Sequence, residues 1–136
     1  MSFEVVEGAE LPELVKTASR RQLVQYAGAS GDFYEIHYDQ DFARSTGLPG
    51  VILHGLLKAG FLGQLITSSL GTSGRLKTFE VSYRGLDLPG RPCRCRGRVA
   101  SVQDGLAELE VWTEDPEGNR TTLGRATVEL AEGGAR

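Results

Sequence analysis

The stretch HGLLKAGFLGQLITSSLG, residues 54–71, is the longest apolar run in the chain and decides the predicted fold. Drawn as a helix, it places Leu57 and Phe61 on one side and Leu56 and Ile66 on another, so that it is apolar nearly all round. A helix of this kind is normally buried. Each internal glycine costs about 1 kcal/mol against alanine, which predicts that another element packs closely against the helix backbone. A sheet wrapped around the helix would do so.

The sequence after this helix changes to an alternating pattern of apolar and polar residues. Four such segments are separated by short runs of turn-forming residues, and they cover residues 76–83, 91–102, 106–115 and 119–130. This pattern predicts an antiparallel meander of strands joined by hairpin turns. Residues 14–17 offer one further strand ahead of the helix.

Two short helices are predicted between the leading strand and the apolar helix. The residues from Ser19 to Gln22 have the form of a capping box, which predicts a helix over about residues 20–27 that ends before Gly28. A second helix is expected over residues 41–47, with Asp39 as its cap and a glycine at its end. The residues between the two helices follow neither a helical nor a strand period, and we interpret them as a structured loop.

These patterns together predict the fold class α+β. The chain has 136 residues, which is enough for one apolar core and too few for two. We expect a single domain over residues 1–136, with its core at about residues 11–130. In this domain an antiparallel sheet wraps around the central apolar helix.

Composition and charge exclude several classes of protein. With 40% hydrophobic residues, 24% charged residues and a formal net charge of −3, the chain is predicted to be neither disordered nor a coiled coil, and it offers no footprint for a polyanion. Arg94, Arg96 and Arg98 form the densest basic cluster, but they alternate with other residues as the solvated face of a strand does. No nucleic-acid partner is therefore expected.

The two cysteines, Cys93 and Cys95, lie two positions apart on one predicted strand, so they point the same way and are poorly placed for a disulfide. No second group of cysteines or histidines lies nearby in the sequence to complete a zinc site. Residues 1–10 lack the features of a signal peptide, and no stretch approaches the roughly 20 apolar residues of a membrane span. We expect a cytoplasmic protein with two buried thiols, no metal and no membrane partner.

Only two histidines occur, His37 and His54, and both fall where the loop meets the apolar helix. Asp32 and His37 are five positions apart on the irregular loop, a spacing that allows the carboxylate and the imidazole to face one small volume. A water molecule held between them could lose a proton to one group while the other handles a second proton. Such residues in a loop are also common as caps or surface groups, and spacing alone leaves both interpretations open.

The start of the apolar helix, at His54 and Gly55, is the second candidate feature. A helix start presents unpaired backbone N–H groups, and Gly55 has no side chain to hinder a ligand carbonyl. Such a site could polarise a thioester carbonyl and stabilise an enolate; a plain helix start with a closely packed glycine is the alternative. For His54 a cap or a hydrogen-bonded core imidazole outweighs a direct catalytic role. His54 and Asp39 are therefore kept as supporting groups.

Several separated blocks of the chain recur in order in one known family. They are YAGASGD at residues 26–32, Ile36 to Asp39, Ala43, Gly47, Ile52 to Leu56, and VSYRGLDLPG at residues 81–90. With these blocks the chain resembles the MaoC-type dehydratase family, which includes R-specific 2-enoyl-CoA hydratases. The resemblance runs over roughly residues 11–130, and the order of the blocks makes it fairly specific.

The resemblance implies roles for individual residues. It implies that Asp32 and His37 are the catalytic pair and that the N–H of Gly55 binds the thioester oxygen. Ser30, in the first block, joins the supporting groups. The resemblance also implies a hotdog fold and a dimer, of two copies or with a related hotdog subunit, in which the two sheets join edge to edge. No metal or redox cofactor is implied, since coenzyme A or acyl carrier protein carries the substrate.

The predicted function is the reversible hydration of a trans-2-enoyl thioester to an (R)-3-hydroxyacyl thioester, which makes the protein a hydro-lyase. The chain departs from the family pattern in four places. Tyr34-Glu35 stands in place of Asn-Pro, Gly63 in place of the small hydroxyl residue of some hydratases, and Leu86 and Arg91 in place of a proline and an acidic residue. These departures leave the acyl group open. A thioesterase and an acyl-binding partner subunit of a heteromeric dehydratase are the alternatives, because one fold hosts several chemistries.

Overall fold

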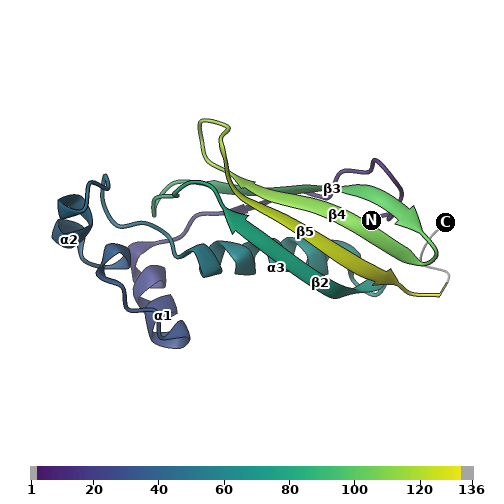
Figure 1. Ribbon diagram of the computed structural model, residues 1–136, viewed down its shortest axis with the longest axis horizontal. Helices are drawn as coiled ribbons and strands as arrows, with labels where there is room; N and C mark the ends of the chain where they lie inside the picture. The colour runs from purple at the N-terminus through teal and green to yellow at the C-terminus, as the bar shows by residue number, and fades with distance from the viewer. Residues whose placement is uncertain (1–2, 133–136) are drawn as a thin grey trace.

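The computed structural model describes residues 3–132. Figure 1 shows one curved sheet lying against a long helix, with two shorter helices beyond the end of the sheet where that helix begins. In chain order the elements are β1 Leu14–Lys16, α1 Arg20–Ser30, the 3-10 turn η1 Glu35–His37, α2 Gln40–Ser45, α3 Gly55–Leu70, β2 Gly74–Tyr83, β3 Cys93–Gln103, β4 Leu106–Glu114 and β5 Arg120–Leu130.

The five strands form one antiparallel sheet in the order β1-β3-β4-β5-β2. β2, the first strand after α3, pairs with β5, the last strand, from Gly74 opposite Leu130 to Tyr83 opposite Thr122. Strands β2 to β5 all contact α3, which lies along one face of the sheet (Figure 1). The predicted arrangement of an antiparallel sheet around a central helix is therefore confirmed.

Each predicted strand is present, and its ends lie within two residues of the predicted ones. The turn between β3 and β4 uses Asp104 at φ 54° and Gly105 at φ 76°. Two successive left-handed residues are typical of the tight hairpin turn whose twist matches that of the strands it joins. The predicted meander is confirmed for β3, β4 and β5, which pair in chain order. It is wrong for β2, which pairs with β5 and is not joined to β3 as a hairpin.

The helix α1 begins at the predicted cap, because Ser19 Oγ accepts a hydrogen bond from the N–H of Gln22 at 3.1 Å. It continues to Ser30, three residues past the predicted end. Gly28 keeps a helical backbone, and the left-handed conformation that ends the helix falls on Gly31, at φ 80°. The predicted helix is therefore confirmed to within a few residues at its end, and the glycine that ends it is Gly31 instead of Gly28.

The helix α2 starts one residue earlier than predicted and ends two residues earlier. Asp39 is its N-cap, as predicted, and its Oδ1 accepts a hydrogen bond from the N–H of Phe42 at 3.0 Å. The chain leaves the helix at Thr46 and turns at Gly47, whose φ is 95°. The cap and the terminating glycine therefore serve as the sequence suggested.

The sheet covers one side of α3 and leaves the other side open. Leu62, Leu65 and Ile66 face the sheet and are at most 1% exposed, whereas Leu56 is 61% exposed. The exposed residues of α3 lie along one side of the helix, which we call the exposed stripe: Leu56, Gly60, Gln64, Thr67 and Ser68. The predicted burial of the helix is therefore confirmed for the side that faces the sheet and not for the exposed stripe, because the single sheet covers one side only.

The glycines of α3 differ in their surroundings. At Gly60 and Gly63, no atom of residues 3–132 outside the helix lies within 4 Å of the position that a Cβ would take. The predicted close packing against the helix glycines therefore fails at these two positions. At Gly55 a Cβ would lie 2.9 Å from a ring carbon of Tyr83. Of the three glycines within α3, only Gly55, at the start of the helix, is closely packed against another element.

Strand β3 turns its two cysteines inward and its three arginines outward, as predicted. Cys93 and Cys95 are buried, free thiols. A hydrogen bond with the Cys95 side chain, together with burial, raises the pKa of the Cys93 thiol, which therefore stays neutral. The arginines form surface ion pairs, Arg94 with Glu13, Arg96 with Glu114 and Arg98 with Glu110. Exposed pairs of this kind contribute little to stability.

Within residues 3–132, no helix combines the length and the apolar character needed to cross a bilayer. The cytoplasmic location stays a prediction. The domain bounds of residues 1–136 also stay a prediction, because residues 1–2 and 133–136 lie outside the described part of the chain.

Candidate active site

The segments that carry the candidate residues, from the end of α1 to the start of α2 and the first turn of α3, lie at the end of the molecule where α3 begins (Figure 1). The loop before α2, the first turn of α3 and the end of β2 line one cleft of about 410 Å³. Its walls include Asp32, His37, Gly55, Lys58, Tyr83 and Leu86. The structure thus brings both members of the predicted pair and the predicted thioester-binding residue to a single cleft.

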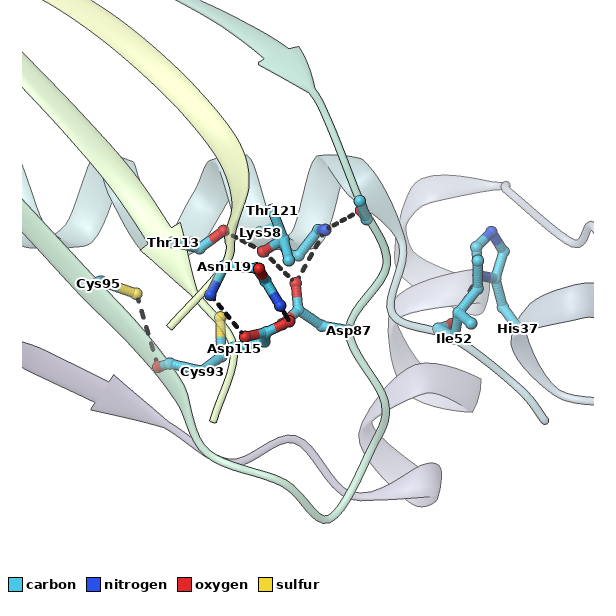
Figure 2. A network of polar contacts seen from close by, with 11 residues as sticks. His37, Ile52, Lys58, Asp87, Cys93, Cys95, Thr113, Asp115, Asn119 and Thr121 are labelled. Carbon is cyan, nitrogen blue, oxygen red and sulfur yellow. Dashed lines mark hydrogen bonds and ion pairs between the residues drawn. The ribbon is translucent and has the colours of Figure 1, made fainter. Parts of the chain in front are cut away.

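The ring of His37 is oriented by the backbone of Ile52. Nδ1 of His37 lies 2.8 Å from the carbonyl oxygen of Ile52, and Figure 2 shows the two residues side by side. The N–H of Ile52 in turn donates to the carbonyl of Ile36 at 3.1 Å. Because a carbonyl can only accept, Nδ1 carries the proton and Nε2 keeps its lone pair. His37, whose side chain is 7% exposed, is therefore ready to accept a proton at Nε2.

Asp32 faces this lone pair. Its Oδ2 lies 3.8 Å from Nε2 of His37, too far for a direct hydrogen bond and close enough for one water molecule to contact both atoms. Its Oδ1 accepts a hydrogen bond from the N–H of Tyr34 at 3.3 Å, and its own N–H donates to Ser30 Oγ at 3.1 Å. The Ser30 hydroxyl donates to the carbonyl of Tyr26 at 2.7 Å. Ser30 thus ties Asp32 to the last turn of α1.

The loop keeps a shape that suits a proline although it has none. Tyr34 has φ −63° and ψ 127°, the conformation that a residue before proline adopts. Glu35 then opens the 3-10 turn that carries His37. The exposed Tyr34 ring lies edge-on to His37 and to Phe42, at 6.4 and 6.0 Å between ring centroids. The backbone of Tyr34 is thus compatible with a following proline, and the pair Tyr34-Glu35 places an aromatic ring beside His37.

His54 is fully buried and packs directly on the candidate pair. Its ring stacks on that of His37, with 3.8 Å between centroids and 19° between planes, and its Nε2 lies 3.3 Å from the backbone carbonyl of Asp32. It occupies the N-cap position of α3 but makes no capping bond with its side chain. Of the two predicted explanations, the cap is wrong and the hydrogen-bonded core imidazole is confirmed.

The environment of His54 favours its neutral form. Burial, and then repulsion between a proton on His54 and the neighbouring His37 imidazole, lower the pKa of His54 below its ordinary value of 6.5, although contacts with Asp32 act in the opposite direction. Among the described residues no group hydrogen-bonds to Nδ1 of His54. A neutral His54 carries one ring proton. This proton lies on Nε2, which donates it to the backbone carbonyl of Asp32.

Acidification is expected to destabilise the fold through His54. Below pH 6.5 the unfolded chain takes up a proton on this imidazole, while the folded protein resists it. Stability carried by neutral His54 is therefore present above pH 6.5 and is lost as the pH falls. Thermal unfolding measured between about pH 7.5 and about pH 5.5 should show a smaller loss of Tm for His54→Gln than for the wild type. Equal losses in the two proteins would contradict this prediction.

Gly55 is the first residue of α3, so its N–H has no acceptor within the helix. It lines the cleft, and the Tyr83 ring covers it closely enough that a Cβ at this position would lie 2.9 to 3.1 Å from three ring carbons. A side chain at position 55 would therefore displace the Tyr83 ring. The arrangement leaves a helix-start amide beside the Asp32–His37 pair.

Asp32, His37 and His54 each offer a ligand atom, and these atoms lie within 4.8 Å of one another. Three such groups within residues 3–132 are a possible metal centre. The rings of His37 and His54 are nearly parallel, however, so their in-plane lone pairs run side by side instead of converging on one ion. Nδ1 of His37 and Nε2 of His54 also face backbone carbonyls. The geometry fits a carboxylate–imidazole acid–base site better than a metal centre.

Three residues at this site were missed by reasoning from sequence. Tyr26 packs edge-on to His54 at 4.8 Å between centroids, and burial, then Tyr83 and Asp32, raise the pKa of its phenol, which stays protonated. Its place in the block YAGASGD was the available signal. Lys58 and Asp87 are buried, although lysine and aspartate are among the residues least often found inside a protein. No local pattern indicated that these two residues would meet.

Comparison with known proteins places the chain in a family. It matches the family model described as MaoC like domain over residues 5–119. It is 32% identical over 126 residues to the 3-oxo-4,17-pregnadiene-20-carboxyl-CoA hydratase beta subunit of Mycobacterium tuberculosis, covering 93% of this chain and 95% of that protein. It is 30% identical over 106 residues to the fatty acid synthase beta subunit TOXC of Cochliobolus carbonum, covering 76% of this chain. The chain spans only 5% of the length of that synthase subunit.

Solved structures share the fold. The ChsH1-ChsH2 complex from Mycobacterium tuberculosis matches with a TM-score of 0.85 at 25% identity, covering 93% of this chain and 98% of the matched chain. The (R)-hydratase from A. caviae matches with a TM-score of 0.85 at 23% identity, covering 92% of this chain and 96% of the other. These likenesses identify the curved sheet around α3 as the predicted hotdog fold. The family match supports hydratase or dehydratase chemistry in general, and the chain belongs to the MaoC-like dehydratase family.

Proposed function

We propose that the protein catalyses the reversible addition of water to a trans-2-enoyl thioester, giving an (R)-3-hydroxyacyl thioester. The observation that carries this proposal is the gap of 3.8 Å between Asp32 Oδ2 and Nε2 of His37. The gap lies in the cleft that Gly55 also lines. It suits one water molecule held between two groups that can each accept a proton.

In the proposed hydration, the water between Asp32 and His37 attacks the third carbon of the acyl chain. As the new C–O bond forms, the water loses one proton to the pair, and the electrons of the double bond move towards the thioester carbonyl to give an enolate. The second carbon then takes a proton back from the same pair. The two groups lie on one side of the substrate, so we infer syn addition. Dehydration reverses each step and leaves the site unchanged.

The enolate oxygen needs a donor, and the start of α3 supplies one. We propose that the N–H of Gly55 binds the thioester oxygen, because a helix-start amide has no partner in the helix and lies at the positive end of the helix dipole. One donor of this kind is worth about 10²- to 10³-fold in kcat. The absence of a side chain at Gly55 allows the thioester to come close to this amide.

We further propose that the substrate is carried on coenzyme A or acyl carrier protein, without a metal or redox cofactor. The chain is proposed to act as a dimer, with a second copy or with a related hotdog subunit. The exposed stripe of α3 and the strand β2 at the edge of the sheet are the surfaces that support a partner. One relative is itself described as a beta subunit, and one matching structure is a complex of two proteins.

The reaction class is tested by following the absorbance of a short trans-2-enoyl-CoA while free thiol is assayed in the same samples. Hydration removes the conjugated double bond, so the absorbance is expected to fall without release of thiol. Release of thiol would instead show a thioesterase. An unchanged absorbance with both short and bulky enoyl-CoA substrates would favour the acyl-binding partner subunit.

A further inference from the structure

A buried ion pair lies in the wall of the cleft, one turn into α3. Nζ of Lys58 is 3.0 Å from Oδ2 of Asp87, and the two side chains are 2% and 4% exposed. The same ammonium donates to the carbonyl of Gly85 at 3.1 Å. Figure 2 shows this cluster between α3 and the connection from β2 to β3. Both Lys58 and Gly85 line the cleft that holds Asp32 and His37.

Stability alone is a poor reason for such a pair. Two charges lose their hydration when they are buried, and their mutual attraction often does no more than offset that loss. Apolar residues of similar size in the same place are frequently as stabilising. The residues that the ion pair holds in place therefore suggest a role other than stability.

The pair and its backbone hold the chain on both sides of Gly55. Two residues before Gly55, the N–H of Leu53 donates to the backbone carbonyl of Asp87 at 2.9 Å. Three residues after it, Lys58 reaches the Asp87 carboxylate with its side chain. One residue of the β2–β3 connection thus fixes both ends of the short segment that contains the Gly55 amide.

The sheet in turn fixes Asp87. The hydroxyl of Thr121, at the start of β5, donates to Oδ2 of Asp87 at 2.6 Å. The oxygen of Thr121 is also 2.8 Å from the hydroxyl oxygen of Thr113 on β4. Because the single proton of Thr121 is used towards Asp87, Thr113 must be the donor in that second bond. A chain of hydrogen bonds therefore runs from β4 through β5 to Lys58 on α3 (Figure 2).

We infer that Lys58 and Asp87 are positioning residues: their buried ion pair sets the place of the Gly55 amide relative to the Asp32–His37 pair. This inference rests on the proposed function, in which that amide binds the thioester oxygen. Substrate binding depends on the whole cleft, whereas the stabilisation of the enolate depends on where this one donor stands. Loss of the pair therefore lowers kcat more than it raises KM.

The central test replaces both charges at once, in Lys58→Met/Asp87→Leu. A single replacement leaves one uncompensated charge in the interior and can unfold the protein, whereas the double replacement keeps the interior apolar. We expect kcat for enoyl-CoA hydration to fall by about 10- to 100-fold, with KM changed by less than about threefold. A matched control removes an exposed pair of the sheet away from β2 and the cleft, in Arg98→Met/Glu110→Leu, and keeps the wild-type kcat.

A second readout does not depend on substrate. In a ¹H–¹⁵N correlation spectrum, the cross-peak of the Gly55 amide is expected to move or broaden in the double variant and to stay in place in the control. An unchanged Gly55 cross-peak together with an unchanged kcat would overturn the inference. Should the wild type fail to hydrate any enoyl-CoA, the proposed function fails, and the Gly55 cross-peak alone decides whether the pair positions this amide.

A milder variant tests the same inference if the double variant does not fold. Thr121→Val keeps the shape of the side chain and removes the hydroxyl that holds Asp87. It is expected to lower kcat by about 3- to 10-fold and to move the Gly55 cross-peak in the same direction as the double variant. If the double variant does not fold, the result with Thr121→Val decides: a wild-type kcat and a wild-type Gly55 cross-peak would contradict the positioning role.

Discussion

Replacing Asp32 with asparagine or His37 with alanine is expected to lower kcat for enoyl-CoA hydration by about 10²- to 10⁴-fold. Each change removes one of the two groups that contact the attacking water in the proposed mechanism. Asparagine keeps the shape of Asp32 and can still accept from the N–H of Tyr34, so the loop is expected to keep its fold. The measurement is the initial rate of absorbance loss at saturating substrate.

A matched control separates chemistry from a change in surface charge. Asp41 is an exposed carboxylate on α2, nine residues from Asp32, and Asp41→Asn makes the same chemical change without touching the cleft. This control is expected to keep the wild-type kcat. If Asp32→Asn and His37→Ala were as active as Asp41→Asn, the proposed catalytic pair would be wrong.

Replacing Gly55 with alanine is expected to lower kcat by about 10- to 100-fold. The new methyl group would lie 2.9 Å from a ring carbon of Tyr83, a distance that forces either the ring or the start of α3 to move. Either movement disturbs the approach of the thioester to the helix-start amide. The fold is expected to persist, because alanine is a better helix former than glycine.

Two further variants identify the cause of that loss. In Gly55→Ala/Tyr83→Leu the smaller side chain relieves the contact, so part of the lost kcat is expected to return. Gly28→Ala, on α1, adds a methyl group where no atom outside the helix lies within 4 Å, and it should leave kcat unchanged. Full activity in Gly55→Ala would argue against a thioester site at this amide.

The parts of the fold that could be predicted are those with a local signal. Alternation reports directly which side chains of a strand face the core, and it placed Cys93 and Cys95 inward correctly. The end of α1 had no such signal, because Gly28 and Gly31 are both able to end a helix. Only the tertiary structure decides which of them adopts a left-handed conformation.

The candidate site was predictable only where its residues are close together in the sequence. Asp32 and His37 are five residues apart, so their meeting in one cleft followed from a short loop. Lys58 and Asp87 are 29 residues apart and meet through the packing of α3 against the β2–β3 connection, which no local pattern reports. The orientation of His37 also depends on the backbone carbonyl of Ile52. Every residue has such a carbonyl, so the sequence does not show which one His37 contacts.

The strand order has a consequence for how the chain is made. Among residues 3–132, β2 pairs with β5 and with no other strand. The first strand synthesised after α3 therefore has no strand to pair with until β5 has been synthesised. Pairing between distant segments is slow and leaves apolar surface uncovered in the meantime. On the ribosome, the sheet can therefore cover the side of α3 that carries Leu62 and Leu65 completely only after residues 120–130 have emerged. Slow release of the C-terminal strand would lengthen the period in which a chaperone can bind this helix.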